Sequence, residues 1–178
     1  MNSATLINNA AVMPQIAPLR ACDLDELTNA LRVGLEAALI LTSSFLANTR
    51  QWSVTRRILN ISSGLGRHAM ASQSAYCASK AGLDHFTRCL ALDEALAVNG
   101  ARVCSLAPGV IDTDMQAQLR TAPPEHFPDQ TRFSRLKQSN QLASASDTAD
   151  RVLSYLARSD FGNEPVADIR DWQPVAPD

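Results

Sequence analysis

Short apolar runs alternate with longer amphipathic segments along this 178-residue chain. The short runs are rich in large apolar residues, and most are halted by asparagine, glycine or proline, a pattern typical of buried strands. The predicted strands are 5–8, 57–62, 102–106 and 165–169. In the longer segments apolar residues recur at spacings of three and four, which predicts helices. The predicted helices are 24–47, 75–98 and 147–158.

The alternation of strands and helices predicts an α/β fold with right-handed crossovers on a parallel sheet. Asp23 precedes the first predicted helix and is expected to be its N-cap, and Asn99-Gly100 is a C-cap signal after the second. Residues 115–146 are polar and contain prolines, and we expect them to form a substrate lid. Residues 1–178 are the size of a single domain.

Composition and charge narrow the possible functions. The chain is 46% hydrophobic and 19% charged, with a net charge of −2. Its sixteen basic residues are scattered among eighteen acidic ones, which argues against nucleic-acid binding. The N-terminus lacks a basic stretch followed by a long apolar run, and Glu36 interrupts the longest apolar block. We therefore expect neither secretion nor a membrane span, but a cytoplasmic protein.

Cysteines and histidines give no sign of a metal site or a disulfide framework. The cysteines lie far apart without a CxxC spacing, which predicts reduced thiols in the core. The histidines lack the spacing of metal ligands. These residues are Cys22, Cys77, Cys89 and Cys104, and His68, His85 and His126.

Candidate chemistry gathers where the predicted strands end. Three of the segments that directly follow a predicted strand carry polar residues or a tight turn, and we call these segments strand exits. They are Asn8–Ala11, Ser62–Gly64 and 107–113. The carboxyl ends of parallel strands share one edge of a sheet, where ligand clefts lie. A predicted helix begins at the same edge and carries Tyr76 and Lys80, whose i, i+4 spacing places them on one face. The spacing alone also fits a solvated helix face, whereas the convergence at the cleft favours a catalytic pair.

These residues resemble the short-chain dehydrogenase/reductase family, whose site has a serine after one strand, a Tyr-x-x-x-Lys motif and then a Pro-Gly turn. Ser63 lies thirteen residues before Tyr76, Lys80 completes the motif, and Pro108-Gly109 supplies the turn. The resemblance narrows toward sepiapterin reductase and bacterial carbonyl reductases of the benzil type. It covers nearly the whole chain, through segments such as LINNAA, ILNISS, AYCASKAG, LAPGVIDTDMQ and VADIRDW.

The resemblance implies a Rossmann-like, doubly wound sheet and NADP-dependent reduction of a small carbonyl compound, with NAD not excluded. It implies a homodimer or homotetramer formed through the helices 24–47 and 75–98. The catalytic residues it implies are Ser63, Tyr76 and Lys80. For cofactor binding it implies Asn9, Ala10, Tyr76, Lys80, Pro108, Gly109, Ile111 and Thr113, and for substrate binding Ser63, Tyr76 and Asp168, with Asp168 as the anchor of the substrate's polar end.

The chemistry of such a site follows from the acidity of its groups. A phenol has a pKa near ~10, and an adjacent ammonium favours the phenolate and lowers that value. We therefore expect Lys80 to lower the pKa of Tyr76, and Tyr76 to give a proton to the substrate carbonyl. Ser63 would donate a hydrogen bond to the same oxygen, where negative charge develops. By the resemblance, Lys80 would also hold the ribose of the nicotinamide.

The chain departs from the family in two places. Gly34 stands where family members carry an asparagine of the proton relay, so we expect close packing there and no part in the relay. Family members also have a Gly-rich turn and further strands before the segment that is Asn8–Ala11 here, and none of the seven glycines forms a G-x-G-x-x-G motif. We therefore expect only the C-terminal strands and helices of the fold, an N-terminally truncated domain.

Two functional classes stay open at this point. One is a carbonyl reductase whose truncated chain is expected to be inactive by itself. The other is a non-catalytic remnant of a reductase that acts as an oligomerisation or interaction module. A serine hydrolase is disfavoured because no Gly-x-Ser-x-Gly motif is present.

Overall fold

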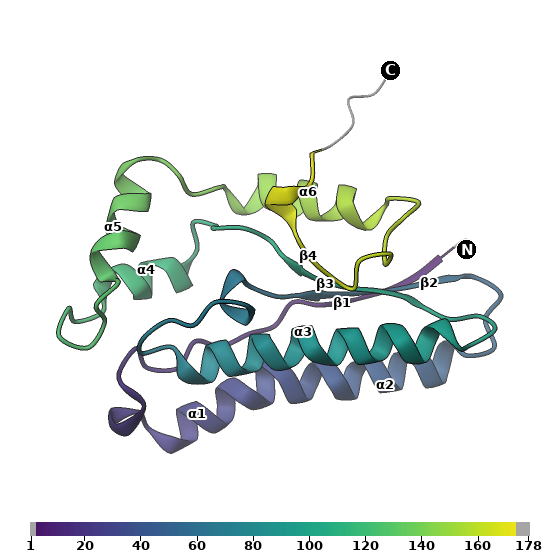
Figure 1. Cartoon of the computed structure of the whole chain (residues 1–178), viewed down its shortest axis with the longest axis horizontal. Coiled ribbons are helices and arrows are strands. Elements are labelled where there is room, and N and C mark those ends of the chain that lie inside the picture. Colours follow the sequence, from purple (N-terminus) through teal and green to yellow (C-terminus); the bar gives the residue numbers. More distant parts are fainter. Residues whose placement is uncertain (1–2, 174–178) are drawn as a thin grey trace.

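The computed structural model describes residues 3–173 and confirms the α/β class with a partial Rossmann-like sheet (Figure 1). Four parallel strands form one sheet in the order β1-β2-β3-β4. In register, Asn8 lies opposite Asn60, Ile61 opposite Leu106, and Ala107 opposite Asp168. The carboxyl ends of all four strands therefore meet at one edge of the sheet. The strands are β1 (Ser3–Asn8), β2 (Thr55–Ile61), β3 (Arg102–Ala107) and β4 (Val166–Asp168).

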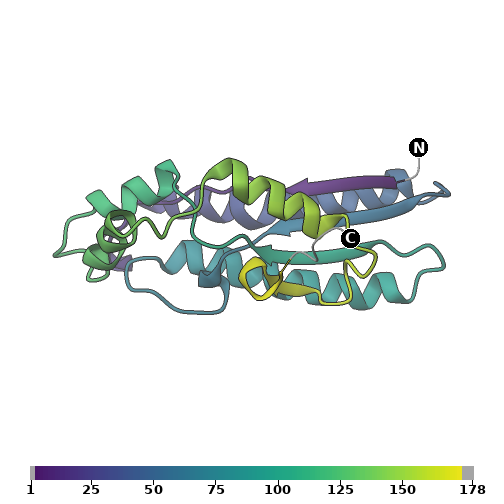
Figure 2. The same ribbon diagram turned by 90° about the horizontal axis from the view of Figure 1, so that it is seen from above.

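Helices cover both faces of this sheet (Figures 1 and 2). One face carries α1 (Leu24–Leu31), η2 (Arg32–Glu36), α2 (Ala37–Thr49) and α3 (Ser74–Ala95), and the other carries α6 (Ala145–Leu156). Successive side chains of β2 point to opposite faces, because the side-chain period of a strand is two. Ile58 accordingly packs with Leu90 under α3, and Leu59 packs with Val152 under α6. A strand buried on both faces explains why its sequence reads as an apolar run.

A chain of buried amides and hydroxyls ties the helices to the sheet. The side-chain amide of Asn8 donates to the Thr42 hydroxyl at 3.1 Å and to the Asn60 side-chain oxygen at 2.8 Å. Asn60 in turn donates to the Thr87 hydroxyl at 2.8 Å. Each strand is thereby linked to the helix beneath it, β1 to α2 and β2 to α3.

The predicted helix 24–47 forms, but it is not one regular α-helix. Asp23 caps it as predicted, since its carboxylate accepts from the backbone N–H groups of Asp25 and Glu26. The helix then contains a π-helical segment, η2, between α1 and α2. At this segment Gly34 faces Ser79 so closely that an added Cβ would lie 3.0 Å from the Ser79 Oγ. The expectation that Gly34 serves close packing is therefore confirmed.

Residues 115–146 contain two short helices, α4 (Asp114–Thr121) and α5 (Gln130–Gln138), which extend beyond the carboxyl end of the sheet (Figure 1). They share a small core with the loop after β1, in which Leu119, Phe127 and Phe133 are buried together with Ile16. The segment is tied back to the sheet where Ala143 exchanges backbone hydrogen bonds with Val110 and Asp112. That this segment is a substrate lid stays a prediction.

Three smaller expectations differ from the structure. The helix predicted to reach residue 98 ends at Ala95, and the predicted strand 165–169 ends at Asp168, whose carboxylate accepts from the backbone N–H of Arg170 and starts η4 (Ile169–Asp171). Of the four thiols predicted to lie in the core, Cys104 is buried, Cys22 and Cys77 are half-buried, and Cys89 is exposed because it lies on the outer side of α3. All four cysteines are free, as predicted.

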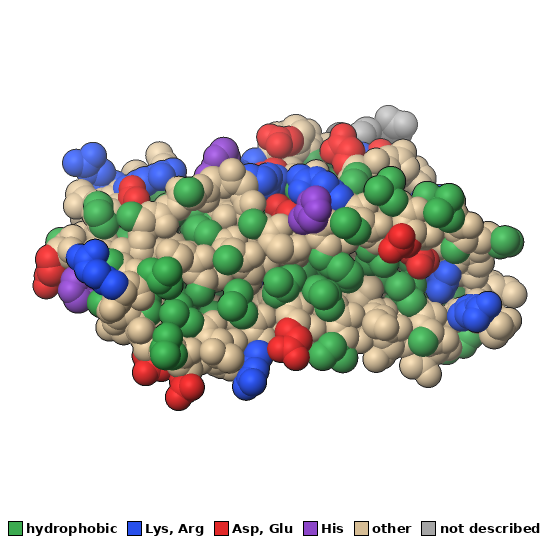
Figure 3. All heavy atoms as spheres, turned by 60° about the horizontal axis from the view of Figure 1, so that its bottom comes forward, with side chains coloured by type: hydrophobic (Ala, Val, Ile, Leu, Met, Phe, Trp, Pro, Cys, Tyr) green, Lys and Arg blue, Asp and Glu red, His purple; other side chains and the backbone are tan. Residues whose placement is uncertain are grey.

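The outer side of the helical layer is unusually apolar, and Figure 3 shows hydrophobic side chains gathered on this face. Leu24–Thr49 is long and apolar enough to cross a membrane by length and composition, yet this helix contacts β1, β2 and α3 in the fold. Its outer side chains, with those of α3, form what we call the apolar helical face. The face comprises Leu39, Ile40, Leu41, Leu92 and Leu96.

Candidate active site

Ser63 and Tyr76 meet at the carboxyl end of β2. Ser63 follows the strand directly and caps η3 (Gly64–Gly66), since its hydroxyl accepts from the backbone N–H of Leu65 at 3.2 Å. Tyr76 lies in the first turn of α3 and is 8% exposed. The Ser63 hydroxyl lies beside the Tyr76 phenol and acts to lower its pKa. The structure thus brings together the serine and the tyrosine that the sequence placed thirteen residues apart.

Lys80 lies one helical turn after Tyr76 and is almost fully buried. Its Nζ lies 5.7 Å from the centre of the Tyr76 ring and donates to the backbone carbonyl of Ile61 at 2.8 Å. The ammonium therefore sits beside the phenol, as the i, i+4 spacing predicts.

The acidity of this pair differs from the expectation. Burial raises the pKa of Tyr76 above its ordinary value; the Ser63 hydroxyl opposes this effect, and the neighbouring Cys77 adds to it. The prediction of a lowered pKa is thus wrong for this chain, because burial outweighs the polar contacts. Burial also lowers the pKa of Lys80 to about 8, while Asp84 acts to raise it. At neutral pH the pair is a protonated phenol beside an ammonium.

The other predicted cofactor-binding residues lie at the same edge of the sheet but make few contacts. Asn9 and Ala10 are exposed after β1. Gly109, in the turn with Pro108 after β3, has a φ of 86°, which favours glycine. Ile111 forms an isolated bridge with Ala143, and Thr113 is exposed at the start of α4.

Asp168 is not a free carboxylate. Both of its oxygens accept from the guanidinium of Arg170, at 2.9 Å and 2.7 Å, and this contact lowers the pKa of Asp168. Arg170 also approaches the turns at Gly64 and Gly109. Because Arg170 occupies the carboxylate, the more exposed polar group on this side of the site is a cation instead of an anion.

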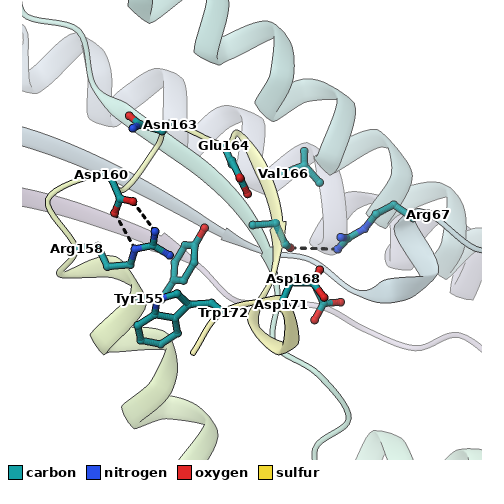
Figure 4. A pocket seen from close by; sticks show the side chains of 11 residues that line it. Arg67, Tyr155, Arg158, Asp160, Asn163, Glu164, Val166, Asp168, Asp171 and Trp172 are labelled. Carbon is teal, nitrogen blue, oxygen red and sulfur yellow. Dashed lines mark hydrogen bonds and ion pairs between the residues drawn. The ribbon is translucent and has the colours of Figure 1, made fainter. Parts of the chain in front are cut away.

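Asp168 also lines a pocket of about 420 Å³ at the outer edge of β4 (Figure 4). There Arg67 donates to the backbone carbonyl of Ala167 at 3.3 Å, and Arg158 lies over the ring of Tyr155, 4.8 Å from its centre. Neither Ser63, Tyr76 nor Lys80 lines this pocket. The pocket is therefore separate from the Ser-Tyr-Lys cluster.

One buried acidic residue near the site was missed by sequence reasoning. Asp84 lies one turn after Lys80 on α3, is 1% exposed and accepts hydrogen bonds from Ser62 and Ser105. The signal available in the sequence was its spacing, since Tyr76, Lys80 and Asp84 recur every four residues. Among residues 3–173 no cluster of side chains suited to a metal ion is found.

The sequence profile of the short chain dehydrogenase family matches residues 4–124, more than half of the chain. The chain belongs to this family. A benzil reductase ((S)-benzoin forming) of Bacillus cereus is 35% identical over 169 residues, which are 95% of this chain and 68% of the relative. Sepiapterin reductase of Rattus norvegicus is 31% identical over 93% of this chain and 63% of its own length. This short-chain dehydrogenase thus spans about two thirds of the length of these relatives.

The fold agrees with this assignment. The crystal structure of the KRED1-Pglu enzyme superposes with a TM-score of 0.76 at 27% identity, over 90% of this chain and 66% of the other. The family and its reductase relatives make this chain an oxidoreductase by class.

Proposed function

We propose that this chain supplies the catalytic centre of an NADP-dependent carbonyl reductase. The observation that carries the proposal is the convergence of Ser63, Tyr76 and Lys80 at the carboxyl end of β2, with the serine beside the tyrosine hydroxyl and the lysine ammonium 5.7 Å from its ring. A buried phenol with a raised pKa keeps its proton at neutral pH, which suits a general acid in the reducing direction.

Each side chain has a distinct part in the proposed reaction. Tyr76 gives its proton to the carbonyl oxygen, and Ser63 donates a hydrogen bond to the same oxygen as negative charge develops there. Lys80 stabilises the phenolate that Tyr76 becomes, because its ammonium lies over that ring. A buried, preorganised cation acts more strongly than a solvated one, since little water screens it.

The described residues fit one end of a nicotinamide cofactor. Asn9, Ala10 and the turn at Gly109 leave open backbone at the strand exits, and Lys80 provides an ammonium for the ribose hydroxyls. When bound, the cofactor supplies the hydride. The pyrophosphate end is different, because within residues 3–173 the exit of β1 leads to no Gly-rich turn at a helix N-terminus. We infer that a further βαβ segment like those of the longer family members is needed for tight binding.

The proposed substrate is a small carbonyl compound. The relatives at 35% and 31% identity are named for the reduction of benzil and of sepiapterin, and both names point to carbonyl chemistry. Because Asp168 is paired with Arg170, we expect the exposed guanidinium to favour substrates whose far end accepts hydrogen bonds.

A titration of nicotinamide fluorescence tests the proposal. The 178-residue chain alone is expected to show no saturable NADPH binding, and joining it to the N-terminal segment of a benzil reductase should restore both binding and benzil reduction. Absence of reduction by a joined protein that binds NADPH would overturn the proposed catalytic role. Tight binding by the 178 residues alone would instead show that the added segment is not required.

A second candidate function is an oligomerisation module, which the apolar helical face favours. Leu92 is 71% and Leu96 is 89% exposed. Large apolar side chains in contact with water are unfavourable in free energy, and a patch of them is typical of an interface. This candidate predicts stable assembly with no reduction by the joined protein. Assembly alone does not separate the two candidates, since a reductase can also assemble through this face; reduction of benzil by the joined protein does.

A further inference from the structure

Asp84 is a buried carboxylate with more polar side-chain contacts than Ser63, Tyr76 or Lys80. Its Oδ1 accepts from the Ser62 hydroxyl at 2.5 Å and from the Ser105 hydroxyl at 2.6 Å. Its Oδ2 lies 3.5 Å from Arg67 Nε and is one of the few buried side-chain atoms without a hydrogen-bond partner. A carboxylate buried so fully is costly unless it is paired, so these contacts need a physical account.

The contacts of Asp84 belong to a set that joins the end of β2 to α3. Three consecutive residues at the end of β2 contact three successive turns of α3. The pairs are Ser63 with Tyr76, Ile61 with Lys80, and Ser62 with Asp84. Asp84 is thus the third member of a series whose first two members are the proposed catalytic tyrosine and lysine.

Gly66 allows the loop after β2 to close over this series. A Cβ built on Gly66 would lie 2.8 Å from Asp84 Oδ2 and 3.0 Å from the backbone carbonyl of Lys80. Backbone at that distance leaves no room for a water molecule, so the carboxylate acts on Lys80 through a medium of low polarity.

Few charged groups surround Lys80. Among the described residues, α3 carries the titratable Tyr76, Cys77 and Asp84, and the segment after η3 carries His68 and Arg67, of which Arg67 faces Asp84. From β2 comes the Ile61 carbonyl, and η2 presents the uncharged Gly34 and Leu35 to α3. On the β4 side Asp168 and Arg170 neutralise each other. Asp84 is therefore the negative charge that acts most directly on the buried ammonium.

We propose that Asp84 is a positioning residue of the site: its carboxylate fixes the Ser62-Ser63 segment through the Ser62 hydroxyl and places a buried negative charge one helical turn after Lys80. The inference rests on the proposed function in treating Lys80 as functional. The placement of Ser63 against Tyr76 and the charge beside the phenol then depend on one side chain that touches neither substrate nor cofactor.

The lysine content of the chain makes a direct test simple. The sequence contains two lysines, Lys80 and Lys137. Labelling of lysine side chains with carbon-13 at Cε therefore gives two NMR signals, which the Lys137→Arg variant assigns. Titration of the Lys80 signal reports its pKa without any turnover or added cofactor.

Three variants separate an electrostatic role from a purely structural one. Asp84→Asn keeps the shape but removes the charge, and should lower the pKa of Lys80 from about 8 by about one unit, a roughly tenfold rise in its acid dissociation constant. Arg67→Gln removes the cation that faces Asp84 and should shift the pKa of Lys80 upward. Ser105→Ala keeps both charges, so it should reduce stability with the Lys80 titration unchanged.

The Lys80 titrations in these variants either support or overturn the proposed role of Asp84. A folded Asp84→Asn variant with an unchanged Lys80 titration would overturn the proposal. If that variant does not fold, an unchanged titration in Arg67→Gln would overturn it instead. Failure of the proposed function is distinguishable, since a joined protein that binds NADPH without reducing benzil would contradict the reductase while leaving these pKa shifts in place.

Discussion

Tyr76 carries the phenol hydroxyl that the proposed reaction uses, beside Ser63, so removal of this hydroxyl is the sharpest test at the scale of a residue. In the chain joined to the N-terminal segment of a benzil reductase, Tyr76→Phe should abolish benzil reduction, because only the transferable proton is lost. Its free energy of unfolding should fall by only about 0.5–1.5 kcal/mol, the contribution of one hydrogen bond. Turnover and urea unfolding measure the two effects, and near-normal turnover would contradict the assignment.

Lys80 gives a prediction about stability and pH. Its pKa is about 8 in the folded chain and about 10.4 in an unfolded chain, so between these values the unfolded state binds more protons. The free energy of unfolding should therefore rise with pH across this window, by up to about 3 kcal/mol. The Lys80→Met variant should lack this rise. Urea unfolding of both proteins at several pH values measures this rise. If the free energy of unfolding changes with pH in the same way for both, the pKa of Lys80 is not lowered in the folded chain.

The site residues show what a sequence can and cannot predict. Ser63, Tyr76 and Lys80 were found because strand exits and helical spacing are local patterns that a parallel sheet brings to one edge. Asp84 was not found, because an acidic residue four positions after a lysine equally fits a solvated helix face. The pairing of Asp168 with Arg170 was missed for a similar reason, since side-chain contacts after a strand leave no periodic signal.

At the scale of an element, Gly34 sets how closely the π-helical segment approaches α3. Gly34→Asn should reduce the free energy of unfolding by about 1–3 kcal/mol, because the new side chain would overlap the buried Ser79. The matched control is Glu36→Asn, an exposed position in the same segment, where the change should be within about 0.5 kcal/mol. Equal stability of the two variants would show that η2 can move away from α3.

The elements themselves were largely predictable from the sequence. Apolar runs located all four strands, since β2 and β3 are buried on both faces, and Asp23 marked the start of the first long helix correctly. The π-helical segment could not be predicted, because the apolar spacing across 24–47 is continuous. It depends on the contact of Gly34 with Ser79, which lies forty-five residues further along the chain.

At the scale of the whole molecule, two surfaces favour self-association. One is the apolar helical face, and the other is the free edge of β1, since this strand pairs only with β2 in the described sheet. We expect the 178-residue chain to sediment as more than a monomer. Leu92→Lys should reduce association through the face, and Thr5→Lys should reduce it through the edge.

Both positions in that comparison are exposed, so neither substitution should unfold the chain. Analytical ultracentrifugation of the two variants identifies the surface that is used. A monomeric parent chain would contradict the expectation for both surfaces.

The contact between Lys80 and Ile61 has an evolutionary consequence, because its acceptor is a backbone carbonyl. No substitution at position 61 can delete that oxygen, so the contact is robust to point mutation. The contact is vulnerable to insertions and deletions. One added residue at the end of β2 would displace the Ile61 carbonyl from Lys80, and it would also displace Ser62 from Asp84 and Ser63 from Tyr76. Lineages that retain this site should therefore accept any apolar residue that packs at position 61, since Ile61 lies against the core beneath α6, while tolerating no change of length between it and Ser63.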